Sequence, residues 1–402
     1  MVNSEETGKI TYAQITATEK FADVGQISSL YGNTRWKPGR EARCCAFSKD
    51  GLKFAWSVGY GQVKVESHLQ AFKEVSDFVE SNSTGRIIDC SSNVVSMEFA
   101  PSLPILANSS ALLATGLEGG QIKIWNTDTG EMVFNLSDHE SRINGLTFSP
   151  CGLPILVSCS LDKTLKVWDL GDDGNMSLTI TGHKLPISDC AFSPTNPHML
   201  ASVGMGKSVI VWKLIHKRSF ELALRLRGHN NDVVACSWSP DGALLATASH
   251  DTTAIVWDPF TGSQIALLAH QYPMPCPIYV GGANGSWVTS VCFSSDGTKL
   301  ATVCEDNCLR VWKMWGDNEV TIVQTDLSKL GHQCRFSPDG SILAVGKQDG
   351  SLTVAHDKES GVKPLRHLSR LAARQCLNTQ NIEALTMPKS IKDYLLYRSS
   401  LN

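Results

Sequence analysis

The hydrophobic and polar positions of the chain repeat as a block of short strands and turns that occurs seven times. Each copy opens with an apolar strand that ends in an aromatic residue, and a turn such as Ser-Pro-Asp-Gly follows. Proline fixes φ and glycine accepts the left-handed conformation, so this turn favours a reversal between strands. A second strand, a tight turn and a third strand complete the copy. The seven aromatic residues are Phe47, Phe99, Phe148, Phe192, Trp238, Phe293 and Phe336.

The ends of the copies carry a second regularity. Gly-His stands near the next opening at His183, His229 and His332, and other X-His pairs occupy equivalent points. A period of roughly 40–45 residues with these features is typical of WD-repeat propeller blades, which the chain resembles. The resemblance implies an all-β fold, a seven-bladed WD-repeat β-propeller, because stacking sheets in a ring buries both faces of each blade. Five third strands end in tryptophan, at Trp125, Trp168, Trp212, Trp257 and Trp312.

WD-repeat blades often contain a hydrogen-bonded structural set of His, Ser or Thr, Asp and Trp. The fifth copy resembles the full set, with His229, Ser249, Asp251 and Trp257. Gly119 and Gly206 replace the aspartate in the second and fourth copies, so we expect those two blades to be less tightly held. Aspartate occupies the same turn in three other copies, as Asp162, Asp306 and Asp349.

The seventh copy ends after three strands, one strand short of a complete blade. WD-repeat rings often take the missing strand from the opposite terminus. Ile10 and Tyr12 alternate with polar neighbours, so we predict the closing strand at Lys9–Ile15, within an N-terminal segment over residues 1–40. The propeller itself is predicted over residues 41–357.

Two insertions break the spacing of the copies. Residues 66–92 carry apolar side chains at helical spacing, which predicts a surface helix between the first two blades. Residues 271–287 are rich in proline and glycine and predict a loop before the sixth blade. Long loops with aromatic residues are often functional, and packing against a neighbouring blade is the alternative.

The composition narrows the function mainly by exclusion. A net charge of −3 gives no general attraction to nucleic acid or to anionic lipid. The sequence has no apolar run of about eighteen residues, the length that spans a membrane. The N-terminus lacks the apolar centre of a signal peptide. We therefore expect an intracellular protein with reduced thiols, in the cytoplasm, with the nucleus left open.

No residue pattern in the sequence predicts catalysis or a cofactor. Val203–Ser208 contains Gly-Lys-Ser, but it lacks the first glycine of a phosphate-binding loop and precedes a strand. We therefore expect no enzymatic activity, no cofactor and no metal ion. Four cysteines stand two residues before a blade aromatic, which indicates an inward position for a small hydrophobic residue: Cys45, Cys190, Cys236 and Cys334.

After residue 362 the strand pattern stops and two short helical patterns follow. Leu365, Ser369 and Ala373 form one apolar stripe, and the arginines at 366, 370 and 374 form an adjacent stripe that we expect to face solvent. A helix this short is marginal alone in water, so it needs a partner surface. Pro388 can begin the second helix at its first position.

This tail, residues 362–402, resembles a SOCS box. Its first half, 364–377, fits the elongin-binding pattern of proline, leucine, three residues, cysteine or serine, three residues and an aliphatic residue. Its second half, 385–398, resembles the Leu-Pro-apolar-Pro cullin box, except that Thr386 replaces the first proline. The resemblance implies elongin contacts by Pro364, Leu365, Leu368, Ser369, Ala372 and Ala373. It implies cullin contacts by Leu385, Met387, Pro388, Ile391, Tyr394 and Leu395.

The whole arrangement resembles the WD repeat and SOCS box-containing proteins. That resemblance implies a non-catalytic substrate-recognition subunit of a ubiquitin ligase with elongin B, elongin C, cullin-5 and its RING subunit. The propeller would then hold an unknown protein substrate. Two alternatives remain: a scaffold for signalling complexes without ubiquitin transfer, and a tail that only packs on the propeller. Candidate substrate-binding residues on the loops are Arg142, Lys163, Lys184, Asn231 and Trp287.

Overall fold

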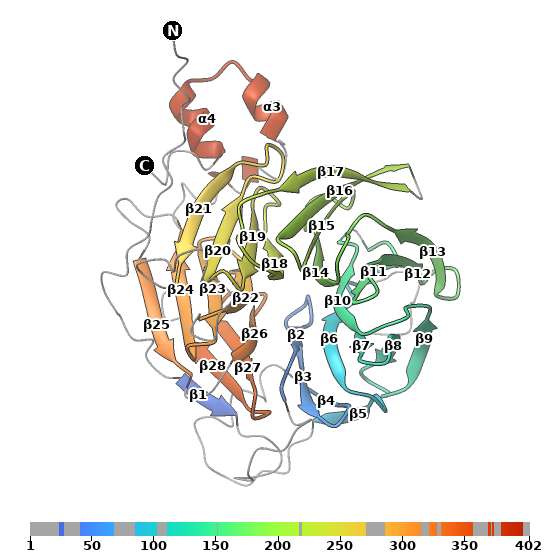
Figure 1. The fold of residues 1–402 in the computed structure, drawn as a ribbon. Helices are drawn as coiled ribbons and strands as arrows, with labels where there is room; N and C mark the ends of the chain where they lie inside the picture. Colours follow the sequence, from blue (N-terminus) through green and yellow to red (C-terminus); the bar gives the residue numbers. More distant parts are fainter. Residues whose placement is uncertain are drawn as a thin grey trace.

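A computed structural model describes most of the repeat region and part of the tail. The described residues are 24–27, 41–67, 85–102, 111–150, 152–216, 219–270, 286–314, 321–327, 331–356, 369–370, 372–373 and 379–396. Within them, seven four-stranded antiparallel sheets stand in a ring as the blades of a β-propeller (Figure 1). The all-β, seven-bladed fold expected from the repeats is therefore confirmed.

The first four blades follow the chain order. Blade one holds β2 (Cys45–Phe47), β3 (Lys53–Gly59), β4 (Gln62–Ser67) and β5 (Arg86–Asp89). Blade two holds β6 (Val94–Phe99), β7 (Leu112–Leu117), β8 (Gln121–Asn126) and β9 (Met132–Ser137). Blade three holds β10 (Ile143–Phe148), β11 (Ile155–Ser160), β12 (Leu165–Asp169) and β13 (Asn175–Ile180). Blade four holds β14 (Ile187–Phe192), β15 (Met199–Gly204), β16 (Ser208–His216) and β17 (Ser219–Leu226).

Blades five and six also follow the chain order, whereas blade seven takes its fourth strand from the N-terminal part of the chain. Blade five holds β18 (Val233–Trp238), β19 (Leu245–Ser249), β20 (Thr253–Trp257) and β21 (Gln264–Ala269). Blade six holds β22 (Val288–Phe293), β23 (Lys299–Cys304), β24 (Cys308–Lys313) and β25 (Thr321–Asp326). Blade seven holds β26 (Gly331–Phe336), β27 (Ile342–Lys347), β28 (Leu352–His356) and, from the other end of the chain, β1 (Val24–Ile27).

Blade seven is closed by an N-terminal strand, but not at the predicted position. Val24 to Ile27 pair antiparallel with Ala355 to Leu352, so β1 occupies the fourth place of the sheet. The prediction of Lys9–Ile15 as the closing strand is therefore wrong, and that segment lies outside the described residues. Closure by β1 joins the two ends of the propeller region in one sheet, which leaves blade seven with no missing strand.

The two insertions also have definite places in the fold. β4 and β5 are neighbours in blade one, so the insertion after Ser67 lies within the first blade and not between the first two blades. The residues predicted as its helix, 68–84, lie outside the described residues, as do residues 271–285 of the second insertion. Gly331-His332 begins β26 and does not precede it, so this pair is not equivalent to the other Gly-His pairs.

The core lies between the blades. β19 and β20 are buried along their whole length, whereas the outer strand β9 is mostly exposed and buries only Leu136. These middle strands are therefore covered on both faces, and they bury polar residues such as Thr247 and Ser249 together with apolar ones. Trp257 and Trp312 are fully buried in the clusters that join neighbouring blades. The four cysteines of the repeated position, Cys45, Cys190, Cys236 and Cys334, are buried in such clusters too.

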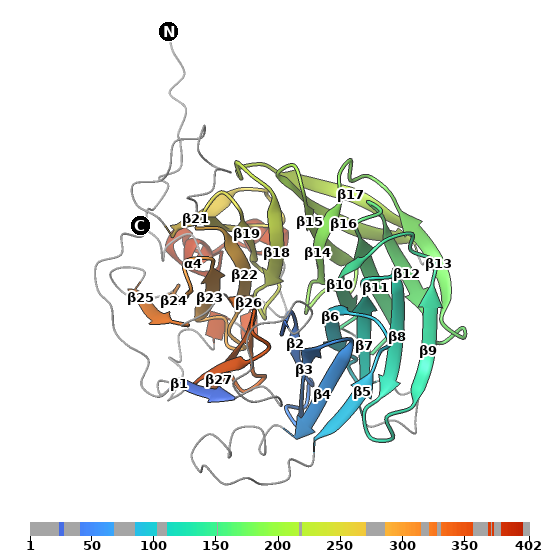
Figure 2. The same ribbon diagram turned by 60° about the horizontal axis from the view of Figure 1, so that its bottom comes forward.

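The first strand of each blade lies toward the centre of the ring (Figure 2). In blades two to seven this strand has a register shift near its start, as between Ile143 and Gly145 and between Val233 and Ala235. A bulge of this kind bends the strand and frees one residue from the ladder. Because consecutive strands of a blade are antiparallel, the connections that enter the first strands lie at the same end of the blades as the tight turns between second and third strands.

The described tail consists of short helices. Residues 369–370 and 372–373 are helical, and α3 (Thr379–Ala384) and α4 (Lys389–Leu395) follow. α3 and α4 form a separate pair of helices beside the ring (Figure 1). None of the helices in the described residues is long and apolar enough to cross a bilayer.

Candidate binding surfaces

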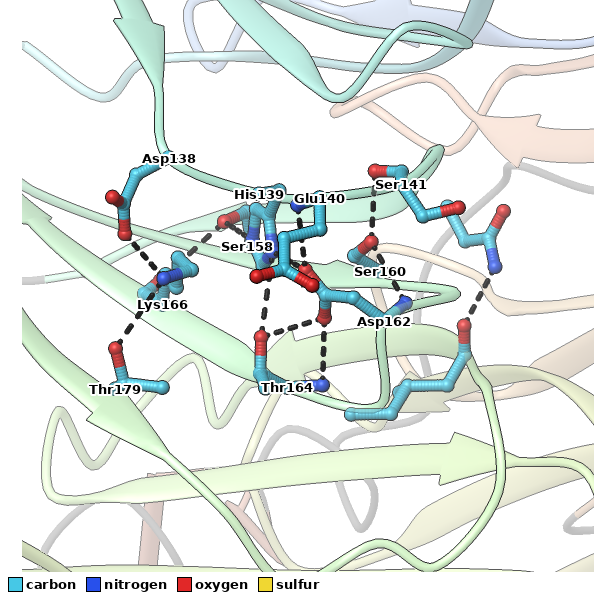
Figure 3. Close-up of polar contacts among 12 residues, drawn as sticks. Asp138, His139, Glu140, Ser141, Ser158, Ser160, Asp162, Thr164, Lys166 and Thr179 are labelled. Carbon is cyan, nitrogen blue, oxygen red and sulfur yellow. Dashed lines mark hydrogen bonds and ion pairs between the residues drawn. The ribbon is translucent and has the colours of Figure 1, made fainter.

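Blade three contains the structural set of the repeat in complete form, and Figure 3 shows its members His139, Ser158 and Asp162. The His139 ring bridges two elements, because Nδ1 donates to Asp162 Oδ2 at 2.6 Å and Nε2 contacts Ser158 Oγ at 2.8 Å. Trp168 Nε1 donates to the same Ser158 Oγ at 2.8 Å. Burial raises the pKa of Asp162, but hydrogen bonds from His139 and Thr164 outweigh it and hold the pKa well below its ordinary value. The loop before β10 is thereby tied to the turn between β11 and β12.

Blade five has the same set, with one correction to its predicted members. His229 Nδ1 donates to Asp251 Oδ2 at 2.8 Å, and both His229 Nε2 and Trp257 Nε1 contact Thr247 Oγ1, at 2.7 and 2.8 Å. The hydroxyl of the set therefore belongs to Thr247, and its assignment to Ser249 is wrong. Ser249 Oγ instead donates to the Asp232 carbonyl at 2.9 Å and accepts the Asp251 N–H at 3.1 Å. It shapes the turn that carries the aspartate.

Blades two and four lack the aspartate, as the sequence indicates. In blade four, His183 Nε2 contacts Ser202 Oγ at 2.6 Å and Trp212 Nε1 donates to it at 2.7 Å. His183 Nδ1 has no hydrogen-bond partner among the described residues. In blade two, Cys90 takes the place of the histidine and its Sγ lies 3.8 Å from Thr115 Oγ1. Each of these blades therefore has fewer polar ties between its loop and its tight turn.

The candidate substrate residues lie on the connections that enter the first strands and on a tight turn between second and third strands, and they differ in exposure. Lys163 and Lys184 are exposed, and Lys163 occupies a left-handed turn position with φ 72°. Arg142 is partly buried, and burial together with the Arg43 charge lowers its pKa. Arg142 Nε has no hydrogen-bond partner within the described chain. Lys163 and Lys184 therefore present their ammonium groups at the surface, where a ligand could use them, whereas the unpaired Nε of Arg142 is buried.

Asn231 and Trp287 have structural contacts. Asn231 Oδ1 accepts the Asp232 N–H at 2.8 Å, which fixes the loop before β18. The Trp287 ring stacks on His250 of blade five, with centroids 4.4 Å apart and planes 19° apart. Packing against a neighbouring blade, the alternative for this loop, thus accounts for the placement of Trp287.

The tail has a small hydrophobic cluster of its own. Ile382, Leu395 and Leu396 are buried, and Ala373, Met387 and Tyr394 pack against them. Lys392 Nζ donates to the Glu383 carbonyl at 2.8 Å, which joins α4 to α3. The prediction that the arginine stripe faces solvent is wrong at Arg370, which is 2% exposed. Its Cζ atom lies 3.8 Å from the centroid of the Tyr394 ring. The planar guanidinium of arginine can stack on an aromatic face, so an arginine can be buried despite its charge.

Half of the predicted elongin-binding residues fall outside the described part of the tail. Pro364, Leu365 and Leu368 are the residues that lie outside the described part. Ser369 and Ala372 are exposed, whereas Ala373 packs into the cluster. The described members therefore present one exposed and one inward side.

The predicted cullin-binding residues divide in the same way. Leu385 is 37% exposed and Ile391 is 47% exposed, and Pro388 is an exposed cap residue before α4. Leu395 is only 8% exposed, and Met387 and Tyr394 pack against the cluster. The sequence analysis did not identify Ile382 and Leu396 as core residues. A signal existed for Ile382, because it is the only large apolar residue of α3.

Comparison with known proteins agrees with both parts of the architecture. Residues 130–169, 174–213, 220–258 and 276–313 match the family described as WD domain, G-beta repeat, and residues 361–396 match the SOCS box. WD repeat and SOCS box-containing protein 1 of Xenopus tropicalis is 40% identical, over 94% of this chain and 96% of that protein. The proteins of that name from Homo sapiens and Danio rerio are 40% and 38% identical, over 90% and 99% of this chain and 92% and 98% of their own. This chain therefore belongs to the family of WD repeat and SOCS box-containing proteins.

Proposed function

We propose that this protein is the substrate-recognition subunit of a cullin-RING ubiquitin ligase. The SOCS box binds elongin C, which brings elongin B, and it selects cullin-5 with its RING subunit. The propeller holds the target protein near the conjugating enzyme. The observation that carries the proposal is a SOCS box, matched over residues 361–396, that follows a closed propeller. Catalysis of this kind is proximity supplied to another protein's active site.

The elongin contact rests on the first half of the box. Ser369 and Ala372 are exposed on the described turn of helix, in line with a surface that continues toward Leu365 in the sequence. Burial of one leucine stabilises a contact by about 1.5–3 kcal/mol, so Leu365 is the proposed anchor of a short interface.

The cullin contact rests on the exposed residues of the second half. Leu385 and Ile391 expose apolar surface on either side of Pro388 in the chain. Leu395, Met387 and Tyr394 hold α3 and α4 together, so we assign them an indirect part: they shape the surface that the cullin meets. Thr386 stands where the cullin box has its first proline, and selection of cullin-5 is the finer part of this proposal.

The test is capture of purified partners by the full chain. Wild-type protein co-expressed with elongin B, elongin C and cullin-5 should retain all three through purification. Leu365→Asp should lose elongin and cullin together, since a carboxylate in an apolar pocket is strongly unfavourable. Leu153→Asp, at a leucine of the propeller that is 47% exposed, is the matched control and should lose nothing. Retention of elongin by Leu365→Asp would contradict the assignment.

A further inference from the structure

Blade four keeps the histidine and the tryptophan of the structural set but has no carboxylate beside them. In blades three and five, Asp162 and Asp251 accept from the histidine Nδ1. In blade four the equivalent turn carries Gly206, so His183 Nδ1 has no acceptor within the described residues. The other two contacts of the set, from Ser202 to His183 and Trp212, are intact.

The unpaired nitrogen of His183 is a donor. A carboxylate only accepts, so in blade five Nδ1 carries the proton and Nε2 accepts from the Thr247 hydroxyl. Ser202 Oγ accepts from Trp212 Nε1, so we assign its hydroxyl proton to the bond with His183 Nε2, which places the ring proton on Nδ1. Burial and the charge of Arg225 lower the pKa of His183 to about 4, which keeps the ring neutral. His183 is 8% exposed, and a buried donor without an acceptor destabilises the folded state.

The surface above this nitrogen is apolar and flanked by cations. A Cβ at Gly206 would come within 2.6 Å of Leu185 Cδ1, so the Leu185 side chain covers the place of the absent aspartate. Leu185 is 46% exposed and Met205 is 39% exposed. Lys184 and Lys207 are exposed. One carboxylate is near, since Asp232 Oδ1 accepts the Gly206 N–H at 2.7 Å.

We propose that blade four binds an acidic side chain of the protein substrate in the place of its absent aspartate. Leu185 moves aside, the incoming Asp or Glu carboxylate accepts from His183 Nδ1, and Lys184 and Lys207 balance its charge. Leu185 and Met205 then contact an apolar residue next to it in the substrate. An aspartate side chain fits best, because it fills the equivalent place in blades three and five. The inference rests on the proposed substrate-receptor function and names its substrate class.

The probe is a capped dipeptide, acetyl-Asp-Leu-amide, titrated into the full chain with isotope-labelled histidine ring nitrogens. The resonance of His183 Nδ1 should move along a saturable curve with a Kd on the order of 1 mM, as for a site that holds two residues. His229 is the internal control, because Asp251 already fills its site, and it should not move. Acetyl-Asn-Leu-amide should give no saturable shift. Acetyl-Gly-Leu with a free C-terminal carboxylate tests the other source of a carboxylate, and a stronger effect from it would overturn the assignment to a side chain.

Two variants complete the test. Gly206→Asp places a carboxylate at the site from within the chain, and aspartate tolerates the left-handed φ of 72° found there better than most residues do. In this variant the His183 resonance should start at its bound position and no longer respond to the peptide. Lys184→Ser with Lys207→Ser should weaken the peptide at least about threefold, and it keeps the test valid if Gly206→Asp does not fold.

The outcomes separate this inference from the proposed function. No saturable shift of His183, or the same shift with the asparagine peptide, overturns the acidic-residue site, while elongin capture by the same sample is unaffected. Leu365→Asp should lose elongin and keep the His183 shift. Equal peptide binding by wild type and the double lysine variant would contradict the part given to the cations.

Discussion

At the scale of residues, a few buried polar groups connect the loops of the propeller to its turns. His229 and Asp251 are 4% and 5% exposed, and each has more than one hydrogen bond. In a low-dielectric interior an unsatisfied partner costs more than the bond itself contributes. Blade four shows the alternative: its turn is held without the aspartate, and one ring nitrogen stays unpaired.

Removal of the aspartate from blade five should destabilise the protein. Asp251→Ala leaves His229 Nδ1 and the Asn230 N–H, 2.7 Å from the carboxylate, without their acceptor. We expect the free energy of unfolding to fall by about 1–3 kcal/mol in urea denaturation. Asp128→Ala removes a carboxylate that is 45% exposed and pairs with Lys53, and it should cost about 0–1 kcal/mol. Equal losses would contradict the importance of the buried set.

The same aspartate should give stability a defined pH dependence. Burial raises the pKa of Asp251, but hydrogen bonds from His229, Thr253 and the Asn230 N–H outweigh the effect of burial, so the net shift is downward. A lowered native pKa stabilises the fold above the ordinary carboxyl pKa, and the contribution disappears as pH falls through the native value. The difference in unfolding free energy between wild type and Asp251→Asn should be constant above about pH 5 and shrink below about pH 4. A difference that grew on acidification would have the wrong sign.

The sequence analysis assigned the hydroxyl of the blade-five set to Ser249, whereas it belongs to Thr247. Thr247 and Ser249 are two apart in β19, so both side chains point to the same face of the sheet. Only the register with β20 and the loop decides between them. A signal did exist: in five blades the tryptophan bonds to a hydroxyl ten residues earlier, at Thr115, Ser158, Ser202, Thr247 and Thr302.

At the scale of elements, the closing strand matters most for the ring. β28 would be an edge strand without β1, with a row of unpaired backbone groups. The sequence predicted the terminus that supplies this strand but not its position. Lys9–Ile15 alternates clearly, whereas Val-Gly-Gln-Ile at 24–27 is too short to show a period, and its pairing with β28 is a contact across the whole domain.

Removal of β1 should therefore open the ring. Replacement of residues 24–27 by Gly-Ser repeats should lower the midpoint of thermal unfolding and increase aggregation, because the edge of β28 becomes free to pair with other chains. The same replacement over residues 9–15 is the control. A larger effect at 9–15 than at 24–27 would favour the original position of the strand. Tryptophan fluorescence during a thermal ramp measures the unfolding midpoint, and light scattering in the same ramp measures aggregation.

At the scale of the whole molecule, the described residues form two hydrophobic units, one in the propeller and one in the tail. The propeller clusters extend from blade to blade and close the ring through contacts of β2 with β26, while Ile382, Leu395 and Leu396 form the core of the box. The repeat period predicted the propeller, and the resemblance to a SOCS box predicted a separate helical tail, but the sequence did not predict that this tail has a core of its own. Which box residues face inward depends on the packing of α3 against α4, and local patterns do not contain that information.

This division of the box leads to a test that separates its surface from its core. Leu385→Ala with Ile391→Ala removes exposed apolar groups that the core does not use, so the box should stay folded and keep elongin B and C. Loss of about 1.4 kcal/mol or more of contact energy should weaken cullin-5 binding at least about tenfold in a titration of the purified elongin complex. Met132→Ala with Met176→Ala, at outer-strand positions 48% and 40% exposed, is the matched control and should change nothing.

Ile382→Ala, inside the cluster, should weaken the binding of both elongin and cullin-5, because it creates a cavity in a very small core. If the double surface variant lost elongin together with cullin, the two halves of the box would not be separable surfaces, and the assignment of Leu385 and Ile391 to the cullin would fail.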